Sequence, residues 1–180
     1  MLICYVTKRS RLECPTNART GTLLHVPTHE NPFGQVLVAL VTPMTADGEV
    51  AWDDVERHID AVIEGGADGI VVTGTTGETS TLTDEEKLRL VEVGKSVAQG
   101  RAKIITGGPS NETAHAIQLA KRSEQIGADG IMAVTPYYNK PTQAGVLTHF
   151  RMVADATDLP LILYAVSYTH LRAHETPEHL

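Results

Sequence analysis

The sequence contains no long hydrophobic run, and this absence excludes one class of protein. No stretch of the 180 residues approaches the ~20 apolar residues that a helix needs to cross a bilayer. The apolar patch at the start precedes its basic cluster and is too short for a secretory signal peptide. Apolar residues make up 42% of the chain and charged residues 21%, as in ordinary soluble domains. We therefore expect a globular protein with no membrane partner.

Cysteine and basic charge are also scarce. The two cysteines, Cys4 and Cys14, lie near the start of the chain, and nothing demands an oxidising compartment, so we expect a cytoplasmic protein. The formal net charge is −7, and residues 33–166 hold ten Lys and Arg against eighteen Asp and Glu. Because nucleic-acid binding needs a basic face to neutralise phosphates, we expect no nucleic-acid partner.

Cofactor and metal motifs are missing or weak. The sequence has no GxGxxG fingerprint, no Ser-His-Asp order and no phosphate-loop lysine spacing. His170 and His174 have the spacing of metal ligands on a helix, with His179 nearby, but no acidic third ligand stands at a set distance. We therefore expect no metal and no cofactor. The histidines of the central region fall in predicted helices, where we expect solvated side chains: His58, His115 and His149.

Apolar segments alternate with amphipathic ones from Phe33 onward, and this pattern predicts the fold class. Strands that are apolar throughout, each followed by a helix, indicate a parallel sheet covered by helices. Such sheets bind ligands at the carboxyl ends of their strands. The predicted strands cover 36–43, 69–74, 103–108, 130–136 and 160–166, and the predicted helices cover 52–66, 83–100, a segment after 111, and 142–156.

The regular period leaves two α/β architectures open, a doubly wound sheet and a closed (β/α)8 barrel. Similar units at even spacing, including GADGI at both 66–70 and 127–131, favour the barrel. A complete barrel needs about 250 residues and eight units, and this chain has about five. We expect a TIM barrel truncated to its first five units, residues 33–166. Residues 1–32 and 167–180 lack the pattern and are interpreted as a lead segment and a tail foreign to the domain.

Two polar stretches follow predicted strands. GTTGE (74–78) lacks the lysine of a phosphate loop, and it is typical either of a tight turn or of a loop in which Thr75 and Thr76 bind a small carboxylate. TPYYNKP (135–141) presents two tyrosines that suit a subunit contact or a proton relay. Tyr164 ends the last predicted strand, where a core tyrosine with one hydrogen bond is the alternative to a functional one.

Four segments in this order resemble the dihydrodipicolinate synthase (4-hydroxy-tetrahydrodipicolinate synthase) family of pyruvate-dependent class I aldolases, which are TIM barrels. They are LVTPM (40–44), GTTGE (74–78), TPYYNKP (135–141) and LPLILY (159–164). The resemblance covers residues 33–166, about three quarters of this chain but only about half of a family member. It implies a cytoplasmic lyase of lysine and diaminopimelate biosynthesis, in which pyruvate forms a Schiff base with a lysine and then condenses with aspartate semialdehyde.

The resemblance also implies roles for individual residues. Thr76 matches the residue that holds the pyruvate carboxylate, and Thr75, Tyr138 and Tyr164 match a proton-relay triad. Tyr138 would reach into the site of a neighbouring subunit, and the intact parent is expected to be a homotetramer. The lysine-feedback pocket of some members is only partly matched, because Asn111 and Tyr137 fit but His115 and Lys87 stand in place of a glutamate and a histidine. The sequence therefore does not decide whether lysine regulates the intact parent.

The chain departs from the family at its end. The family's Schiff-base lysine lies on the sixth strand, beyond residue 180, and none of the six lysines here matches it. The family pattern Asn/Asp-x-Pro-x-Arg is replaced by Ala165, Ser167 and Thr169. We interpret SYTHLRAHET (167–176) as the non-native end of a truncated gene model, and we expect the chain as written to be inactive.

Two further hypotheses remain open. One is another pyruvate-dependent aldolase, of the sialic acid lyase or keto-deoxy-sugar type, which would differ in the aldehyde it accepts. The other is a non-catalytic half-barrel that binds pyruvate weakly or associates with copies of itself. Five strands of an eight-stranded barrel would leave two unpaired edges and an uncovered inner face, and such edges invite self-association.

Overall fold

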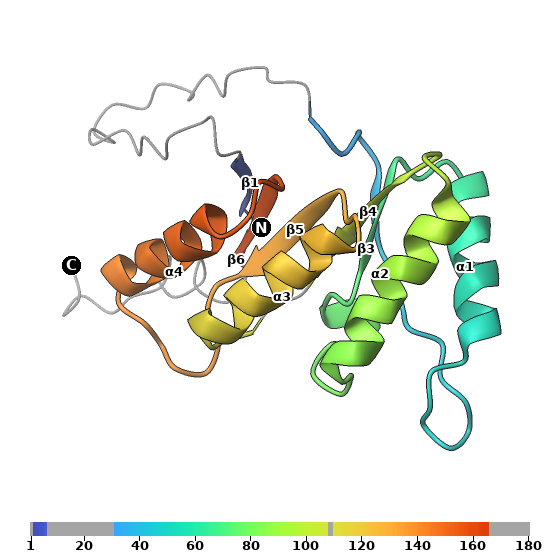
Figure 1. Cartoon of the computed structure of the whole chain (residues 1–180), viewed down its shortest axis with the longest axis horizontal. Helices are drawn as coiled ribbons and strands as arrows, with labels where there is room; N and C mark the ends of the chain where they lie inside the picture. Colours follow the sequence, from blue (N-terminus) through green and yellow to red (C-terminus); the bar gives the residue numbers. More distant parts are fainter. Residues whose placement is uncertain (1, 7–30, 108–109, 166–180) are drawn as a thin grey trace, which may run out of the picture.

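The computed structural model describes residues 2–6, 31–107 and 110–165 and contains a six-stranded sheet in the order β1-β6-β5-β4-β3-β2 (Figure 1). Strands β2 to β6 follow one another in parallel, whereas β1 runs antiparallel to β6. The strands are β1 (Leu2–Val6), β2 (Leu37–Ala39), β3 (Gly69–Val72), β4 (Lys103–Thr106), β5 (Gly130–Val134) and β6 (Leu161–Ala165).

The strand order decides between the two architectures that the sequence left open. A doubly wound sheet reverses its strand order at a switch point, whereas β2 to β6 add in chain order without a reversal. The four helices accordingly lie on the same side of the sheet, so the parallel part forms a curled half-barrel (Figure 1). The expected truncated barrel is confirmed, with five parallel strands and, among the described residues, a helix after each of the first four. The helices are α1 (Trp52–Glu64), α2 (Asp84–Ala98), α3 (Thr113–Gln125) and α4 (Gln143–Asp155).

The outer face of the sheet packs against the helices. On α1, Val55, Ile59 and Ile63 are buried at the helical spacing read from the sequence, and they contact a core that includes Ile70 and Ile104. Each fully buried side chain of this type contributes about 1.5–3 kcal/mol to folding. A second cluster, formed by α3, α4, β5 and β6, continues the same layer: Ala116, Ala120, Ile131, Ala133, Phe150, Val153 and Leu161.

The inner face of the half-barrel has its own buried cluster. Successive side chains of a strand point to opposite faces, so Val71, Ile105 and Ile162 face inward while their neighbours face the helices. Phe33 joins them, and a Cβ on Gly130 would lie 2.3 Å from the Phe33 ring. The inner face near these residues is therefore filled with side chains, and the prediction that it would be uncovered is wrong there.

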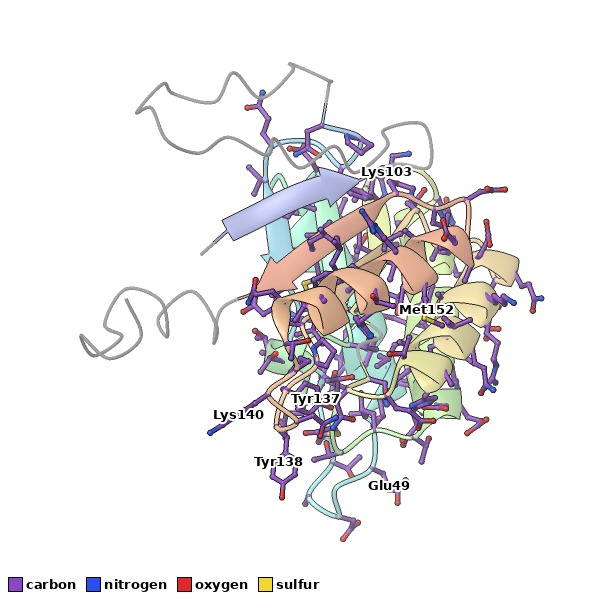
Figure 2. The ribbon with its side chains drawn as sticks, turned by 90° about the vertical axis from the view of Figure 1, so that its left-hand side faces the viewer. Glu49, Lys103, Tyr137, Tyr138, Lys140 and Met152 are labelled. Carbon is purple, nitrogen blue, oxygen red and sulfur yellow. The ribbon has the colours of Figure 1, made fainter. Side chains whose placement is uncertain are left out.

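The strand β1 is the main feature that the sequence interpretation missed. Residues 1–32 show no strand-helix period, yet Leu2–Val6 pairs with Leu161–Ala165 along its whole length. Figure 2 shows the two arrows side by side and pointing in opposite directions. The predicted pair of unpaired edges is therefore wrong on one side, because β1 covers the edge of β6. The interpretations of the tail at 167–180, and of His170, His174 and His179, lie outside the described residues.

His149 also differs from expectation. The sequence placed it among solvated histidines, but its exposed fraction is 4%. It lies on the face of α4 that packs inward, where its Nδ1 is 2.9 Å from the Thr113 hydroxyl and its ring meets Phe150 edge-on. Burial lowers the pKa of His149, although a hydrogen bond with the backbone of Val134 acts in the opposite direction.

Candidate active site

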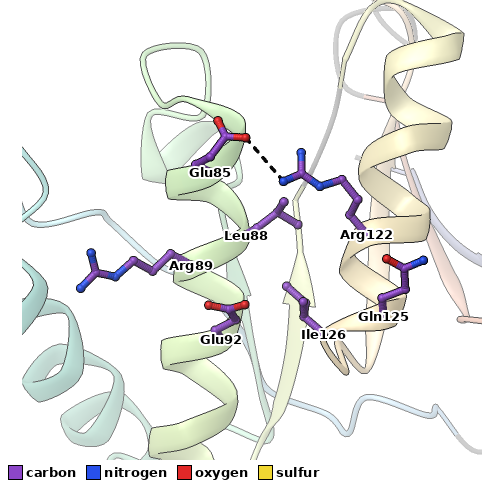
Figure 3. Close-up of a pocket in the computed structure, with 7 residues that line it drawn as sticks. All are labelled: Glu85, Leu88, Arg89, Glu92, Arg122, Gln125 and Ile126. Carbon is purple, nitrogen blue, oxygen red and sulfur yellow. Dashed lines mark hydrogen bonds and ion pairs between the residues drawn. The ribbon is translucent and has the colours of Figure 1, made fainter.

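A shallow hollow of about 240 Å³ lies between α2 and α3 on the outer surface (Figure 3). The ion pair between Glu85 and Arg122, 3.5 Å long, spans its mouth, and apolar Leu88 and Ile126 line it. Ligands of parallel α/β folds bind at the carboxyl ends of the strands, not between the covering helices. This hollow is therefore set apart from the site that the fold itself provides.

Buried threonines mark the carboxyl ends of the parallel strands. Thr73 and Thr135 directly follow β3 and β5, Thr106 is the last residue of β4, and Thr42 lies shortly after β2; all four are buried. The sequence interpretation did not single out these four residues. The available signal was a hydroxyl residue directly after each apolar run. A buried hydroxyl needs hydrogen-bond partners, so these residues are expected to link neighbouring strand ends.

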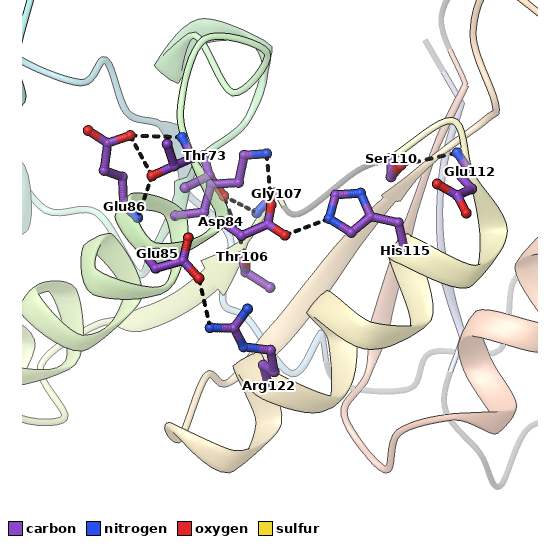
Figure 4. A network of polar contacts seen from close by, with 12 residues as sticks. Thr73, Asp84, Glu85, Glu86, Thr106, Gly107, Ser110, Glu112, His115 and Arg122 are labelled. Carbon is purple, nitrogen blue, oxygen red and sulfur yellow. Dashed lines mark hydrogen bonds and ion pairs between the residues drawn. The ribbon is translucent and has the colours of Figure 1, made fainter.

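The contacts of the threonines bear this out (Figure 4). The hydroxyls of Thr73 and Thr106 lie 3.4 Å apart, and the Gly107 N–H donates to the Thr73 hydroxyl at 3.1 Å. The Thr42 hydroxyl donates to the carbonyl of Gly77 at 2.8 Å. The ends of β2, β3 and β4 are thus tied to one another and to the loop that follows β3.

That loop, residues 74–78, contains the predicted site residues Thr75 and Thr76. It forms a short 3₁₀ turn, η1 (Thr75–Gly77), in which Gly77 N–H donates to Gly74 at 3.0 Å and Glu78 N–H donates to Thr75 at 3.1 Å. The tight turn foreseen as one alternative is present. Both threonine side chains are exposed, and within the described residues neither hydroxyl has a hydrogen-bond partner. Their hydroxyls are therefore available to a ligand.

Two glycines fix this loop from either side. A Cβ on Gly107 would lie 2.6 Å from the backbone nitrogen of Gly74, so the end of β4 approaches the loop closely. A Cβ on Gly77 would lie 3.0 Å from the carbonyl oxygen of Leu40 and 3.1 Å from the Thr42 hydroxyl. Because backbone lies against backbone, the loop has little room to move away from the strand ends.

The backbone of the loop is strained at both ends. Thr73 has φ 57° and Glu78 has φ 55°, a left-handed conformation that is unusual for residues other than glycine, above all for a β-branched one. Such conformations persist only where surrounding contacts over-determine them, and they cluster at functional sites. The hydrogen bonds of Thr73 to Thr106 and Gly107 are contacts of this kind.

Tyr164, predicted as a catalytic residue, lies near the end of β6. It stands two residues after Ile162, so its side chain faces the interior of the half-barrel, and it is half-buried. Its carbonyl accepts the N–H of Thr135 at 3.0 Å. Thr75 and Tyr164 therefore belong to the same rim, three strands apart in the sheet order.

Tyr138, the third predicted catalytic residue, lies in the loop that follows β5. It is 92% exposed and has φ 71°, in the loop between β5 and α4. Figure 2 shows it beside Tyr137 and projecting away from the body, at the end opposite Lys103. A tyrosine so exposed can act only if something outside this chain's own fold covers it. Tyr138 therefore follows the carboxyl end of its strand, as Thr75 and Thr76 follow theirs, but its side chain extends into solvent.

Charged residues of α2 and α3 form a cluster next to the site loop. Asp84 lies 2.7 Å from His115 Nε2 and 3.5 Å from Lys87 Nζ (Figure 4). Burial opposes ionisation of Asp84, but the hydrogen bond and attraction of His115, together with Lys87, outweigh it and lower the pKa of Asp84. His115 and Lys87, which the sequence analysis interpreted as departures from a feedback pocket, are therefore both paired with one carboxylate.

The described residues also bear on metals and membranes. They contain no group of three or more His, Cys, Asp or Glu placed to hold a metal ion. Within that same part of the chain, no helix combines the length and apolar character needed to cross a bilayer.

Comparison with known proteins gives a consistent result. The model of the dihydrodipicolinate synthetase family matches residues 32–172. A 4-hydroxy-tetrahydrodipicolinate synthase of Acidothermus cellulolyticus is 50% identical over 135 residues, which are 75% of this chain and 44% of that protein. The chain thus spans about half the length of the curated relatives it matches.

Solved structures agree with the sequence matches. The synthase from Cyanidioschyzon merolae with lysine bound has a TM-score of 0.74 and 44% identity, covering 76% of this chain and 47% of that one. The chloride-inhibited synthase from Acinetobacter baumannii, complexed with pyruvate, has a TM-score of 0.73 and 46% identity, covering 76% of this chain and 46% of that one. The chain belongs to the dihydrodipicolinate synthetase family.

Proposed function

We propose that this chain is the first half of a 4-hydroxy-tetrahydrodipicolinate synthase, which condenses pyruvate with aspartate semialdehyde in lysine and diaminopimelate biosynthesis. The names of the relatives that are about half identical support this activity. The observation that carries the proposal within the chain is the clamped loop of residues 74–78, with two exposed threonine hydroxyls at the carboxyl end of β3.

Thr76 would bind the carboxylate of pyruvate. A short 3₁₀ turn whose hydroxyls have no partner inside the described chain can donate to a small anion without breaking an existing bond. The close contacts of Gly107 and Gly77 hold the turn in place before the ligand arrives, so little ordering is needed on binding. The pyruvate complex of the Acinetobacter relative is in keeping with this ligand.

Thr75, Tyr138 and Tyr164 would relay protons. Tyr164 faces the interior of the half-barrel on the same rim as Thr75. Tyr138 is exposed on its loop, so its part in the relay requires a neighbouring subunit that brings it to a site, which fits a homotetrameric parent. A tyrosine hydroxyl can pass a proton in either direction when it is hydrogen-bonded on both sides.

The covalent step needs an amine, and among the described lysines only Lys140, exposed in the loop after β5, follows the carboxyl end of a strand. A lysine amine would add to the pyruvate carbonyl and lose water to form the imine. Loss of a proton from the methyl group would then give the enamine, whose carbon would attack the aldehyde. Lys87 and Lys95 lie on the outer helices, paired with Asp84 and Asp129. Lys103 opens β4 at the opposite end of the sheet. We therefore infer that the chain alone forms no Schiff base and has no turnover.

A chimera tests the proposed function directly. Residues 33–165 of this chain would replace the matching part of the Acidothermus synthase, so that the relative supplies the rest of the barrel. We expect the chimera to consume pyruvate and aspartate semialdehyde, measured by a coupled assay of the condensation product. A chimera that folds and instead cleaves or forms a sugar-derived keto acid would favour the other aldolase activity.

Single substitutions in the chimera test the site. Thr75→Val and Tyr164→Phe should each lower kcat by about 10²-fold or more if they relay protons. Thr76→Val should chiefly raise the KM for pyruvate. Thr148→Val, on the exposed side of α4, is the matched control and should leave both parameters unchanged. Wild-type kinetics in the Thr75 and Tyr164 variants would contradict the assigned roles.

A further inference from the structure

The pairing of β1 with β6 differs from every other strand pair of the sheet. Strands β2 to β6 pair in parallel, whereas β1 is antiparallel and comes from the opposite end of the chain. In the register, Leu2 stands opposite Ala165, Cys4 opposite Leu163 and Val6 opposite Leu161. The pair therefore covers all five residues of β6.

The hydrogen bonds of β6 show which of its residues face β1. The carbonyl of Pro160 accepts the N–H of Ile131 in β5, and the carbonyl of Tyr164 accepts the N–H of Thr135 just after β5, both at 3.0 Å. The backbone groups of successive residues point to opposite sides of a strand, so the N–H and C=O of Leu163 point towards β1. Leu161 and Ala165 do the same.

The same alternation assigns the backbone groups of β1. Directly opposite residues of an antiparallel pair either exchange both hydrogen bonds or none. Cys4 stands opposite Leu163, so its N–H faces β6, as do those of Leu2 and Val6. The N–H groups of Ile3 and Tyr5 face away from β6.

The edge of β6 would be prone to pairing with other strands if it were uncovered. The strand reads LILYA, five residues without charge or proline, and such an edge is a template for pairing with another chain. The other edge of the sheet is different, because β2 has only three residues and very short edge strands pair poorly. Any further parallel strand of the barrel would have to add at the side of β6 that β1 now fills.

We propose that the free side of β6 is a strand-accepting surface and that its occupant is the chain's own N-terminal strand, Leu2–Val6. β1 in this position excludes both the next parallel strand of a barrel and edge-to-edge pairing with a second copy. Barrel extension at β6 and pairing with β1 are therefore mutually exclusive states. This assignment is independent of the reaction proposed above, because it concerns backbone pairing and not the hydroxyl of Tyr164, the proposed site residue on β6.

Hydrogen exchange of the wild-type chain gives the first test. We expect slow amide exchange at Cys4 and fast exchange at Ile3 and Tyr5, together with slow exchange at Leu163, all independent of protein concentration. Fast exchange at Cys4 would overturn the proposal. Protection of Leu163 that appears only as the concentration is raised would mean that the strand comes from a second copy, and would overturn it as well.

Two proline variants give a matched pair for the second test. Cys4→Pro removes an N–H that faces β6, whereas Tyr5→Pro removes one that faces away, where an edge strand tolerates proline. We expect Cys4→Pro to speed exchange at Leu163 by at least about tenfold, because its covering strand is lost. Ile162, paired with β5, and Ile104, whose N–H donates to the Asp129 carboxylate at 2.8 Å, should stay protected. Tyr5→Pro should leave Leu163 unchanged.

A peptide of residues 1–6 completes the experiment. Added to the Cys4→Pro variant, the peptide should restore the slow exchange of Leu163. Without the peptide, sedimentation should show the variant self-associating at concentrations where the wild type does not. Equal effects of the two proline variants, or unchanged exchange at Leu163 in Cys4→Pro, would contradict the assignment. If Ile104 also lost protection in Cys4→Pro, the substitution would have disturbed the whole sheet. In that case, failure of the peptide to restore slow exchange at Leu163 would contradict the assignment.

Discussion

Gly107 illustrates how a single side-chain position fixes the site loop. A Cβ there would meet the nitrogen, 2.6 Å away, and the Cα, 2.7 Å away, of Gly74, which are backbone atoms that cannot rotate aside. At Gly74 itself a Cβ would meet only the tip of Met132, at 3.4 Å, and Val71, at 3.7 Å. Gly74 and Gly107, which contact each other, thus differ in whether a larger side chain can be accommodated.

We therefore predict opposite outcomes for two alanine substitutions. Gly107→Ala should lower the free energy of unfolding by about 3 kcal/mol or more, because strand and loop must separate. Gly74→Ala, whose φ of −76° suits any residue, should change it by no more than about 1 kcal/mol. Denaturant unfolding of both variants measures this. Equal losses would show that the loop is not clamped as described.

Part of the pH dependence of stability can be assigned to His149. Its ordinary pKa is 6.5 and burial lowers that pKa in the folded state. Between the lowered pKa and 6.5 the unfolded chain therefore binds more protons than the folded one. Stability is fully present above pH 6.5 and is lost as the pH falls through this window.

The His149→Gln variant tests this effect. The wild type should lose at most about 1.4 kcal/mol per pH unit below 6.5 through this residue. The variant should lack that component, so the difference in unfolding free energy between the two proteins should change between pH 7.5 and pH 5. Parallel pH profiles, measured by urea unfolding in matched buffers, would contradict the assignment.

Among the elements, the repeated segment GADG has a structural explanation. Asp68 donates its N–H to the carbonyl of Val36, and its carboxylate accepts the N–H of Val36 in return, at 2.9 and 2.8 Å. Asp129 makes the same two bonds with Ile104, both at 2.8 Å. Each aspartate thus ties the start of its own strand to the preceding parallel strand. Backbone hydrogen bonds also lower the pKa of Asp68.

The carboxylate of Asp129 also pairs with two lysines, which makes Asp129 a better position to test than Asp68. Lys95 lies 2.7 Å and Lys103 3.6 Å from its carboxylate. Asp129→Ala should cost about 2–3 kcal/mol, because the Ile104 N–H loses a charged acceptor. Asp155→Ala, at the exposed end of α4, is the control and should stay within about 0.5 kcal/mol. Thermal unfolding compares them, and equal shifts would argue against a special role for the repeat.

At the scale of the whole molecule, the half-barrel provides one part of a ring of strand ends. The parallel strands bring Thr42, Thr73, Thr106 and Thr135 to one rim, and the helices all lie on the other side of the sheet from the inner cluster. Five neighbouring parallel strands span about 19 Å along the sheet, so the rim surrounds a ligand only partly. We therefore expect this part of the barrel to bind a small ligand only weakly.

Borohydride trapping measures this limit on the chain itself. Treated with pyruvate and borohydride, the 180-residue chain should show no covalent adduct by mass spectrometry, whereas the chimera with the Acidothermus synthase should be trapped. Pyruvate should bind the chain weakly, and Thr76→Val should weaken that binding further, as followed by ligand-observed NMR. An adduct on the isolated chain would show that one of its own lysines reaches the bound pyruvate.

Much of the fold was determined by the sequence alone because its causes are local. Apolar runs and helical periodicity predicted β2 to β6 and α1 to α4. The start of α2 also has a local cause, because Thr83 and Glu86 form a capping box there. Motifs in fixed order also identified the family. The strand ends then followed from topology, so Thr75, Thr76 and Tyr164 could be placed on one rim.

Other features were decided only by the tertiary structure, because they depend on residues far apart in the chain. Nothing near Leu2–Val6 reveals that β6, more than 150 residues later, has a free edge that it can fill. The burial of His149 depends on how α4 packs, and the hydroxyl pair of Thr73 and Thr106 depends on β3 lying beside β4. A local sequence pattern determines which face of its helix or strand a side chain occupies. Only the folded chain determines which residues pack against that side chain.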